Sequence, residues 1–153
     1  MADMPDKDFF RKMIEVAFVS ANTTGDATAL EPYYHPHHQI HTDFHNTDKE
    51  HLEGMRAEAQ IWSKIVSDMT AKAEHIVIDG DMVAVHWRVS ARHHGTHQHT
   101  VAGHVKGSGQ TVHASGMLLL KVRDGKIEEE WRYDDILQVL INSGAVTIPK
   151  AAA

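Results

Sequence analysis

The spacing of hydrophobic residues changes from a helical to a strand period partway along the chain. Between Asp6 and Ala21, apolar residues recur every three or four positions, which predicts an amphipathic helix. The same spacing predicts another helix from about Lys49 to Ser67, with Ile65 and Val66 on its inner face. From Met69 onward apolar and polar residues alternate, which is typical of strands with one buried face. The chain is therefore expected to place helices first and a sheet second.

Turn signals divide the rest of the chain into short elements. Asp26 can cap a short helix, and Pro32 and Pro36 then favour extended chain. Asp-Gly pairs supply the positive φ of tight turns, so hairpins are predicted around Gly80 and Gly125. The other expected elements are a short strand at His38 to Phe44, hairpin strands at His75 to Ile78, Met82 to Arg92, Thr111 to Val122 and Ile127 to Tyr133, an extended connection from Gly95 to Gly109, and a final helix from about Asp135 to Asn142.

These elements make up one α+β domain. With 153 residues, 42% of them hydrophobic, the chain can bury one core and is too short for two ordinary domains. We expect a single domain over residues 1–147 and a short tail over residues 148–153. N-terminal helices packed on a curved antiparallel sheet would form a cone open at one end, and such a cone can hold a small-molecule ligand.

The composition of the chain limits which cellular compartment and which binding partners are expected. The chain has no cysteine, which excludes disulfides and thiolate metal sites and favours a reducing compartment. A net charge of -6 without a cluster of Lys or Arg argues against nucleic-acid binding. No apolar stretch approaches the roughly 20 residues of a membrane span, and the N-terminal segment lacks the apolar run of a signal peptide. We therefore expect a cytoplasmic protein without a nucleic-acid or membrane partner.

Three segments of the chain carry motifs in a fixed order. They are Tyr34 with Pro36 and His41, then Asp79 to Trp87 with His93 and Gly95, and then Ser115-Gly116 with Asp124 to Trp131, Asp135 and Gly144. In this order and spacing they resemble the SnoaL-like polyketide cyclases and predicted ester cyclases of the nuclear-transport-factor-like superfamily. The resemblance covers nearly the whole chain. It implies the cone-shaped fold, a pocket for a small molecule, and a homodimer formed through the outer face of the sheet.

The resemblance also implies a chemistry that two positions contradict. The best-understood relatives close a ring by an intramolecular aldol reaction without a cofactor, using an aspartate as acid and base and a histidine to stabilise an enolate. When the motifs are aligned on Gly125, these two positions fall on Arg132 and Leu118. An arginine does not take up a proton near neutral pH, and a leucine has no polar group. We therefore expect the fold and pocket of the family without its cyclase Asp/His pair.

Charged residues near the end of the last strand are the first catalytic candidates. Glu128, Glu130 and Arg132 alternate along the strand and are expected on one face. At a surface they would form a weak ion pair. In a pocket, Arg132 could bind an oxyanion and Glu130, its pKa raised by burial, could act as a base. Asp135 could supply a catalytic carboxylate or simply cap the final helix.

Histidine and aromatic side chains supply the remaining candidates. His41 resembles a histidine that lines the cavity in the family, and with an ordinary pKa of about 6.5 it could act as an acid or a base. The alternative is a structural, hydrogen-bonded histidine. Tyr34, Trp62, Trp87, His93 and Leu118 are predicted to contact the ligand, although ordinary core packing would explain most such residues equally well.

The chain contains 14 histidines, which raises the question of a metal. His37, His41 and His45 lie on one side of an extended segment and could bind a divalent transition metal. Their spacing matches no standard metal motif, and alternate residues of a strand lie about 6.6 Å apart, which is wide for ligands of one ion. We therefore expect no cofactor, with this metal site as the alternative.

Together these residues predict a SnoaL-like enzyme that transfers a proton on a small, largely apolar carbonyl or ester compound. The reaction could be an isomerisation, dehydration, cyclisation or hydrolysis. A non-catalytic small-molecule binding protein and a His-ligated metalloprotein are the alternatives.

Overall fold

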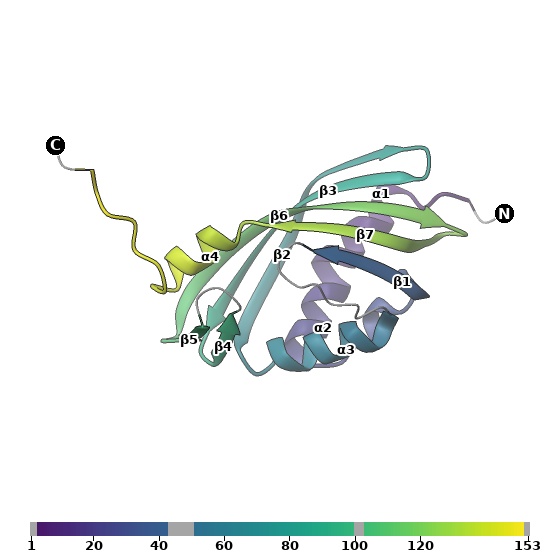
Figure 1. Cartoon of the computed structure of the whole chain (residues 1–153). Helices are drawn as coiled ribbons and strands as arrows, with labels where there is room; N and C mark the ends of the chain where they lie inside the picture. The colour runs from purple at the N-terminus through teal and green to yellow at the C-terminus, as the bar shows by residue number, and fades with distance from the viewer. Residues whose placement is uncertain (1–2, 43–50, 100–102, 152–153) are drawn as a thin grey trace.

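The structure, a computed structural model, describes residues 3–42, 51–99 and 103–151. Helices cover one face of a curved five-stranded sheet, and a two-stranded hairpin and a final helix lie at one end of it (Figure 1). This is the α+β arrangement that the sequence predicts. Within these residues no helix is both long and apolar enough to cross a membrane.

The predicted N-terminal helix forms as three consecutive parts. Its parts are α1 (Lys7–Lys12), the π-helix η1 (Met13–Phe18) and α2 (Val19–Thr24). The helix begins at Asp6, whose carboxylate accepts a hydrogen bond from the amide of Phe9 over 3.0 Å. Gly25 ends it in a left-handed conformation with a φ of 77°. Asp26 then caps the short 3-10 helix η2 (Ala27–Leu30), as predicted.

The helix α3 (His51–Trp62) is shorter than predicted. The predicted continuation beyond its last residue is wrong, because the chain turns and β2 (Val66–Asp79) begins four residues later. Ile65 and Val66 are buried in a small cluster beside the sheet and do not lie on the helix. Apolar spacing alone does not distinguish the last turn of a helix from a turn followed by a strand. The expected start at Lys49 lies outside the described residues.

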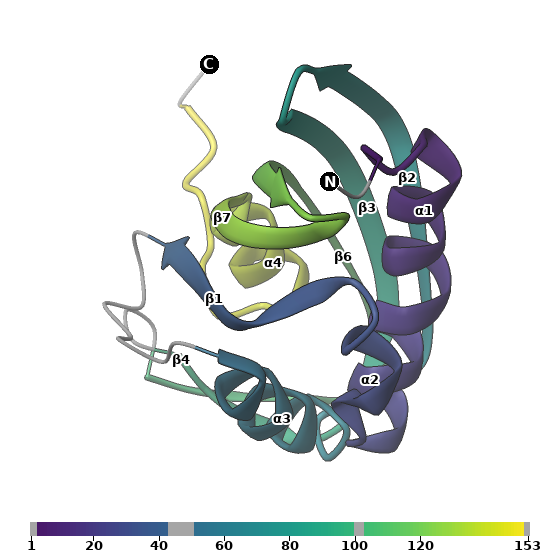
Figure 2. The ribbon, with the colours of Figure 1, turned by 90° about the vertical axis from the view of Figure 1, so that its right-hand side faces the viewer.

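The sheet contains five strands, and both predicted hairpins form. The strands besides β2 are β1 (Tyr34–Thr42), β3 (Met82–His93), β6 (Gln110–Arg123) and β7 (Lys126–Asp134). Their order across the sheet is β1-β7-β6-β3-β2 (Figure 2). The pairs β2 with β3, β3 with β6, and β6 with β7 are antiparallel. The four C-terminal strands therefore form the expected meander.

One pairing differs from the expected antiparallel sheet. β1 runs parallel to β7, so the sheet is mixed. β1 also begins at Tyr34, earlier than the predicted strand, and its register against β7 is irregular between Tyr34 and Gln39. The alternation of apolar residues indicates which face of a strand is buried, but it does not indicate the direction of the neighbouring strand.

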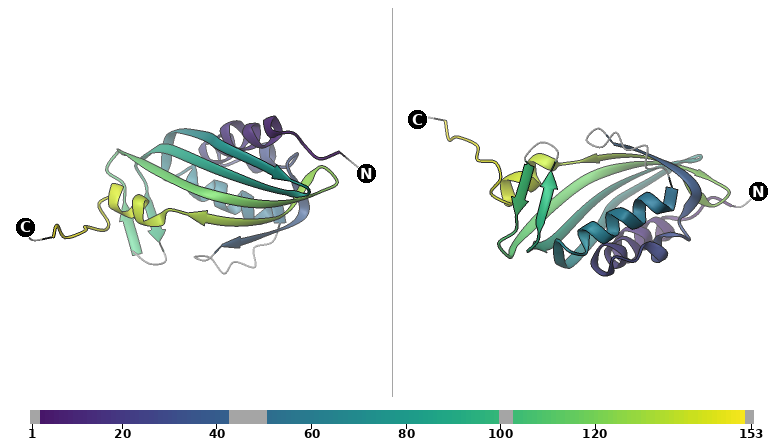
Figure 3. Two further views of the ribbon diagram at one scale, coloured as in Figure 1. Left: turned by 90° about the horizontal axis from the view of Figure 1, so that it is seen from above. Right: turned by 60° about the horizontal axis from the view of Figure 1, so that its bottom comes forward.

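The connection between β3 and β6 folds into a hairpin of its own. Its strands are β4 (Thr96–His99) and β5 (Gly103–Lys106), where the sequence predicted only extended chain. Gly95 lies so close to the turn after α3 that a Cβ there would be 2.5 Å from the carbonyl oxygen of Lys64. The final helix, α4 (Ile136–Asn142), forms as predicted and lies near this hairpin, away from the N-terminus (Figure 3). We call this end of the molecule, which carries β4, β5 and α4, the hairpin end.

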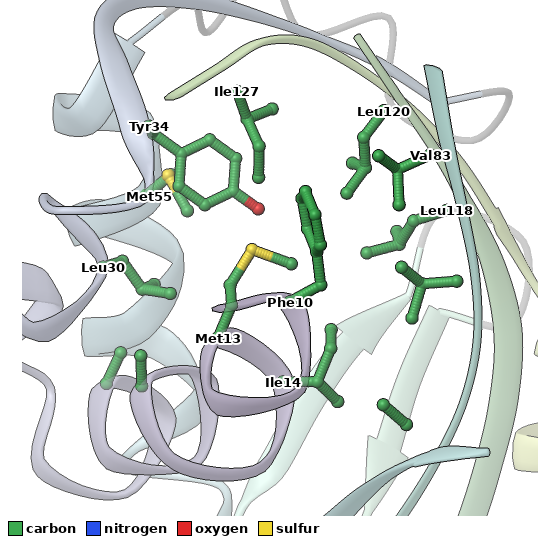
Figure 4. Packing of buried hydrophobic residues seen from close by; sticks show 14 of the residues in the cluster. Phe10, Met13, Ile14, Leu30, Tyr34, Met55, Val83, Leu118, Leu120 and Ile127 are labelled. Atoms are coloured by element: carbon green, nitrogen blue, oxygen red, sulfur yellow. The ribbon is translucent and has the colours of Figure 1, made fainter. Parts of the chain in front are cut away.

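The main core fills the space between the N-terminal helices and one face of the sheet. Phe10 and Met13 from the helices meet Val83, Leu120 and Ile127 from the sheet, and all of these side chains are almost completely buried (Figure 4). We call the face of the sheet that carries them the inner face, and the opposite face the outer face. A compact core of this kind contributes stability through burial of apolar area.

Candidate functional site

A fully buried carboxylate lies at the centre of the candidate site. Glu130 is on β7 with an exposed fraction of 0%, although the inner face around it is mainly apolar. Ile127, three residues earlier, is also fully buried. A strict two-residue alternation would not bury both, and the register between β6 and β7 shifts between Lys121 and Val122, which is the mark of a β-bulge.

Because of the bulge, one acidic residue of β7 does not lie on the face of the strand that the sequence predicts. The prediction that Glu128 shares a face with Glu130 is wrong, because Glu128 turns to Arg123 and forms an ion pair of 2.7 Å with it. Glu130 therefore enters the interior without Glu128 beside it.

Both oxygens of Glu130 have strong hydrogen-bond partners. The hydroxyl of Tyr34, at the start of β1, donates to Oε2 over 2.7 Å. The Nε and Nη2 atoms of Arg132 both lie 2.8 Å from Oε1. A buried ion pair is tolerated only when such bonds offset the loss of hydration. These bonds fix Arg132 against β7, and its side chain remains 18% exposed.

The same contacts change the affinity of two groups for protons. Burial raises the pKa of Tyr34 well above its usual range, and the charge of Glu130 raises it further. For Arg132 burial acts to lower the pKa, but the carboxylates of Glu130, Glu58 and Asp134 outweigh it and the pKa is raised. Tyr34 is therefore neutral and Arg132 positively charged near neutral pH.

The sheet register places three further candidates beside this group. Leu118 on β6 is the direct cross-strand partner of Arg132, and Val85 on β3 is the next residue in the same row. Trp87 lies in the adjacent row opposite Gly116, where a Cβ would be 2.6 Å from the indole ring. Tyr34, Glu130, Arg132, Leu118 and Trp87 thus occupy neighbouring positions on the inner face.

Two residues of this region were missed by sequence reasoning. Glu58 on α3 is 46% exposed, and its Oε1 lies 3.4 Å from Nη1 of Arg132. The signal for it was present, because Glu58 follows Met55 by three residues and precedes Trp62 by four, on the inward stripe of the helix. His38 is fully buried and its ring contacts that of Tyr34, with centroids 4.7 Å apart. The register of β1 against β7 is irregular between Tyr34 and Gln39, so strict alternation along the strand does not predict that His38 is buried.

Two of the predicted catalytic residues lie away from the buried group. His41 is on the outer side of β1, where its Nε2 lies 2.8 Å from Glu129 and its ring stacks on Trp131. Asp135 caps α4 by accepting a hydrogen bond from the amide of Gln138 over 3.1 Å. The capping interpretation of Asp135 is confirmed.

His93 and Trp62 belong to the hairpin end. His93 lies six residues beyond Trp87 on β3, which corresponds to about 20 Å of strand. Its side chain is 6% exposed, and Nε2 has no hydrogen-bond partner among the described residues. Burial lowers the pKa of His93. Trp62 packs beside the small cluster at this end, and its ring contacts that of His97.

The histidines of the alternative metal site are only partly described. His37 is exposed on β1, His41 contacts Glu129, and His45 lies outside the described residues. Over residues 3–42, 51–99 and 103–151, no three His, Asp or Glu side chains are grouped so that they could hold a metal ion.

Two hollows open on the outer face. The larger has a volume of about 840 Å³ and is bordered by β2, β3, β6 and α4. The smaller, of about 650 Å³, is bordered by His75, His86, Met117, Tyr133 and Asp134. Neither includes Glu130 or Arg132.

Helices packed on the concave side of a curled mixed sheet define the nuclear-transport-factor-like α+β fold. The sequence profile of the SnoaL-like polyketide cyclases matches residues 10–141, and the chain belongs to this family. No curated protein matches the sequence.

Solved structures share the fold at low sequence identity. TsrD from Streptomyces laurentii is 22% identical, with a TM-score of 0.76 over 93% of this chain and 99% of that one. IdmH from Streptomyces antibioticus, a putative polyketide cyclase, is 24% identical, with a TM-score of 0.65 over 90% and 96%. A protein with a ketosteroid isomerase-like fold from Catenulispora acidiphila, in complex with trimethylamine, is 14% identical, with a TM-score of 0.67 over 95% and 100%. At these identities the likeness shows the fold alone.

Burial should keep Tyr34 protonated while the protein is folded. An unfolded tyrosine ionises near pH 10, so above about pH 10 the unfolded chain loses a proton that folded Tyr34 retains, and stability falls. We predict that Tyr34→Phe leaves the alkaline tyrosinate absorbance of the folded protein unchanged. The same substitution should remove absorbance once the protein is unfolded at that pH. An equal loss in both states would contradict the predicted protonation of buried Tyr34.

His93 should make the protein sensitive to acid. Its pKa is lowered in the folded state, so below about pH 6.5 the unfolded chain takes up a proton that the folded protein resists, and stability falls. We predict that the urea midpoint of His93→Phe drops less between pH 7 and pH 5 than that of the unmodified protein. His104→Asn, at an exposed position on β5, is the control. An unchanged drop in His93→Phe would refute the assignment.

Proposed function

We propose that this protein is a cofactor-free enzyme that transfers a proton on a small, largely apolar carbonyl or ester compound, with Arg132 holding the oxyanion that forms. The observation that carries the proposal is Arg132, whose partly exposed side chain is fixed by fully buried Glu130 at 2.8 Å on a mainly apolar face. A preorganised cation beside apolar surface stabilises negative charge more than water does, because little reorganisation is needed when the charge develops.

The proton then needs an acceptor that can reach the substrate. Both oxygens of Glu130 already accept hydrogen bonds, from Tyr34 and from Arg132, and the carboxylate is inaccessible. Glu58 is exposed and makes a longer contact of 3.4 Å with Arg132, so its carboxylate is available. We therefore assign Glu58 as the base, and Glu130 and Tyr34 as positioning residues that hold Arg132.

The reaction balances without a further reagent. The C–H bond next to the carbonyl breaks, its proton passes to the carboxylate of Glu58, and its electron pair moves to the carbonyl oxygen, which Arg132 binds as an enolate. Return of the proton to another carbon gives an isomer, and attack of the enolate on a second carbonyl gives a ring. Leu118 and Trp87 supply the apolar wall beside the reacting atoms.

One observation favours a second candidate, a non-catalytic small-molecule carrier. Arg132 and Leu118 are directly opposite each other across β6 and β7. The resemblance, with the motifs aligned on Gly125, implies that these are the positions of the cyclase aspartate and histidine. A chain without these two groups could still bind a small molecule on the inner face without converting it. The two candidates differ in turnover and not in binding.

The enzyme proposal is tested by following exchange of α-protons with deuterated water in a panel of aryl ketones and β-keto esters by NMR. Glu58→Gln and Arg132→Ala should each lower the exchange rate about 10²- to 10³-fold, because each removes a group that acts in the transition state. Arg123→Ala, which removes a surface ion pair with Glu128, should leave the rate unchanged.

Three results would change the assignment. Full exchange activity in folded Glu58→Gln would reject Glu58 as the base. Loss of activity in Glu130→Gln, with folding confirmed by circular dichroism and Glu58→Gln still active, would make Glu130 the base. Binding of a probe by the unmodified protein without any exchange would support the carrier.

We further propose that the protein forms a homodimer through the outer face. The cross-strand row Trp131, Leu119, Ala84 and Val77 is apolar, and Met117 and Tyr133 lie in the adjacent row. Leu119, Val77, Met117 and Tyr133 are exposed large apolar side chains, and a contiguous group of such residues is typical of an interaction surface.

If the outer face forms the dimer, a single substitution in it should halve the mass of the protein in solution. The unmodified protein should sediment at twice the chain mass of 17.1 kDa, and Leu119→Glu should reduce this to one chain because a charge would be buried between the copies. Val16→Glu, at an exposed position on the opposite side of the molecule, is the control. A monomeric unmodified protein at micromolar concentration would exclude this interface.

A further inference from the structure

The outer face is apolar in the row of Leu119 and becomes polar toward the hairpin end. Next to the apolar rows, toward the hairpin end, two successive cross-strand rows carry only polar or charged side chains. These rows are Lys72, Arg88 and Ser115, followed by Thr70, Ser90 and His113. Residues paired across strands share a face, so six polar side chains from three strands project from one patch. We call this patch the polar rows.

A hollow covers the polar rows. Its volume of about 840 Å³ is in the range of sites for small molecules. α4 forms one wall with two amide side chains. Gln138 lies 3.5 Å from the hydroxyl of Ser115, and the Oδ1 of Asn142 accepts a hydrogen bond of 3.2 Å from the amide of His113. The hollow is therefore bordered by the sheet and by a helix that is tied to it.

The cations of the polar rows are only weakly neutralised. The side chains of Lys72 and Arg88 are 69% and 67% exposed. Their acidic neighbour is Glu74, with contacts of 3.7 Å to Lys72 and 4.0 Å to Nε of Arg88. Glu15 also borders the hollow, but its carboxylate accepts a hydrogen bond from the amide of Ala73 over 3.1 Å. Arg88 borders the hollow together with the hydroxyl-bearing residues Thr70, Ser90 and Ser115.

We propose that this hollow binds a small molecule through a phosphate or carboxylate group. A guanidinium, an ammonium and three hydroxyls around one space form the donor set that oxyanions require. Arg88 forms the bidentate contact, Lys72 adds charge, and the hydroxyls of Thr70 and Ser90 donate from the floor. The amides of Gln138 and Asn142 bind the rest of the molecule. Glu74 competes with the ligand for both cations and so limits the affinity.

This site is distinct from the proposed reaction site. Arg88 lies on the outer face, whereas Trp87, the preceding residue, lies on the inner face next to the row of Arg132. The polar rows also lie beside, and not within, the apolar rows of the proposed dimer. Binding at the hollow can therefore be measured whether or not the proton transfer is found.

The test is an NMR titration of amide signals with inorganic phosphate and, separately, with citrate, at constant ionic strength set by sodium chloride. The amides of Ser90 and Ser115 should shift with saturation. Arg88→Ala should weaken binding about tenfold or more, since it removes charge-assisted hydrogen bonds. Glu74→Gln should strengthen binding several-fold, by about the amount expected for removal of a competing charge.

The matched control is Lys121→Ala, which removes a positive charge from the outer face of the same strand six residues from Ser115. It should leave the affinity unchanged. A response to phosphate alone identifies a phosphate site, a response to citrate alone identifies a carboxylate site, and both support the shared chemistry. No saturable shift with either anion, or equal weakening by Arg88→Ala and Lys121→Ala, would overturn the proposal.

Discussion

The carboxylate of Glu130 is a negative charge buried inside an apolar layer, and it is stable there only because both of its oxygens are bonded. Moving an ion from water into a protein interior costs roughly several kcal/mol unless close partners offset the loss of hydration. The partners come from two strands, since Tyr34 begins β1 and Arg132 lies on β7. The buried charge therefore joins β1 to the sheet at one defined register and fixes the direction of the guanidinium.

The alternation of strand residues lets one sheet carry two different surfaces. On β3, Val85 and Trp87 face the core, whereas His86 and Arg88 face outward, and every cross-strand partner follows the same rule. The inner face is mainly apolar around Glu130 and Arg132, and the outer face changes from apolar to polar along the strands. Because both patterns depend on the same register, a slip of one residue would bury Arg88 and expose the core.

Much of the fold could be predicted from the sequence because it depends on local signals. The helical stripe from Asp6, the Asp-Gly turns at Gly80 and Gly125, and the cap at Asp135 each act within a few residues. The candidate site could be predicted only in part. The bulge that turns Glu128 away, the parallel pairing of β1, and the approach of Glu58 to Arg132 all depend on contacts between residues far apart in the chain. No local pattern encodes such contacts.

An arginine at position 132 changes where a proton can move. An aspartate and a histidine facing each other can both gain and lose protons, so a site built on them needs no third group. Arg132 keeps its charge at every accessible pH, because Glu130 raises its pKa further, and Leu118 opposite it is inert. In the proposed reaction, Arg132 supplies electrostatic stabilisation and no proton transfer. The proposed proton transfer therefore needs a separate carboxylate, and the proposed base is the exposed Glu58 on α3, whose Oε1 lies 3.4 Å from Nη1 of Arg132.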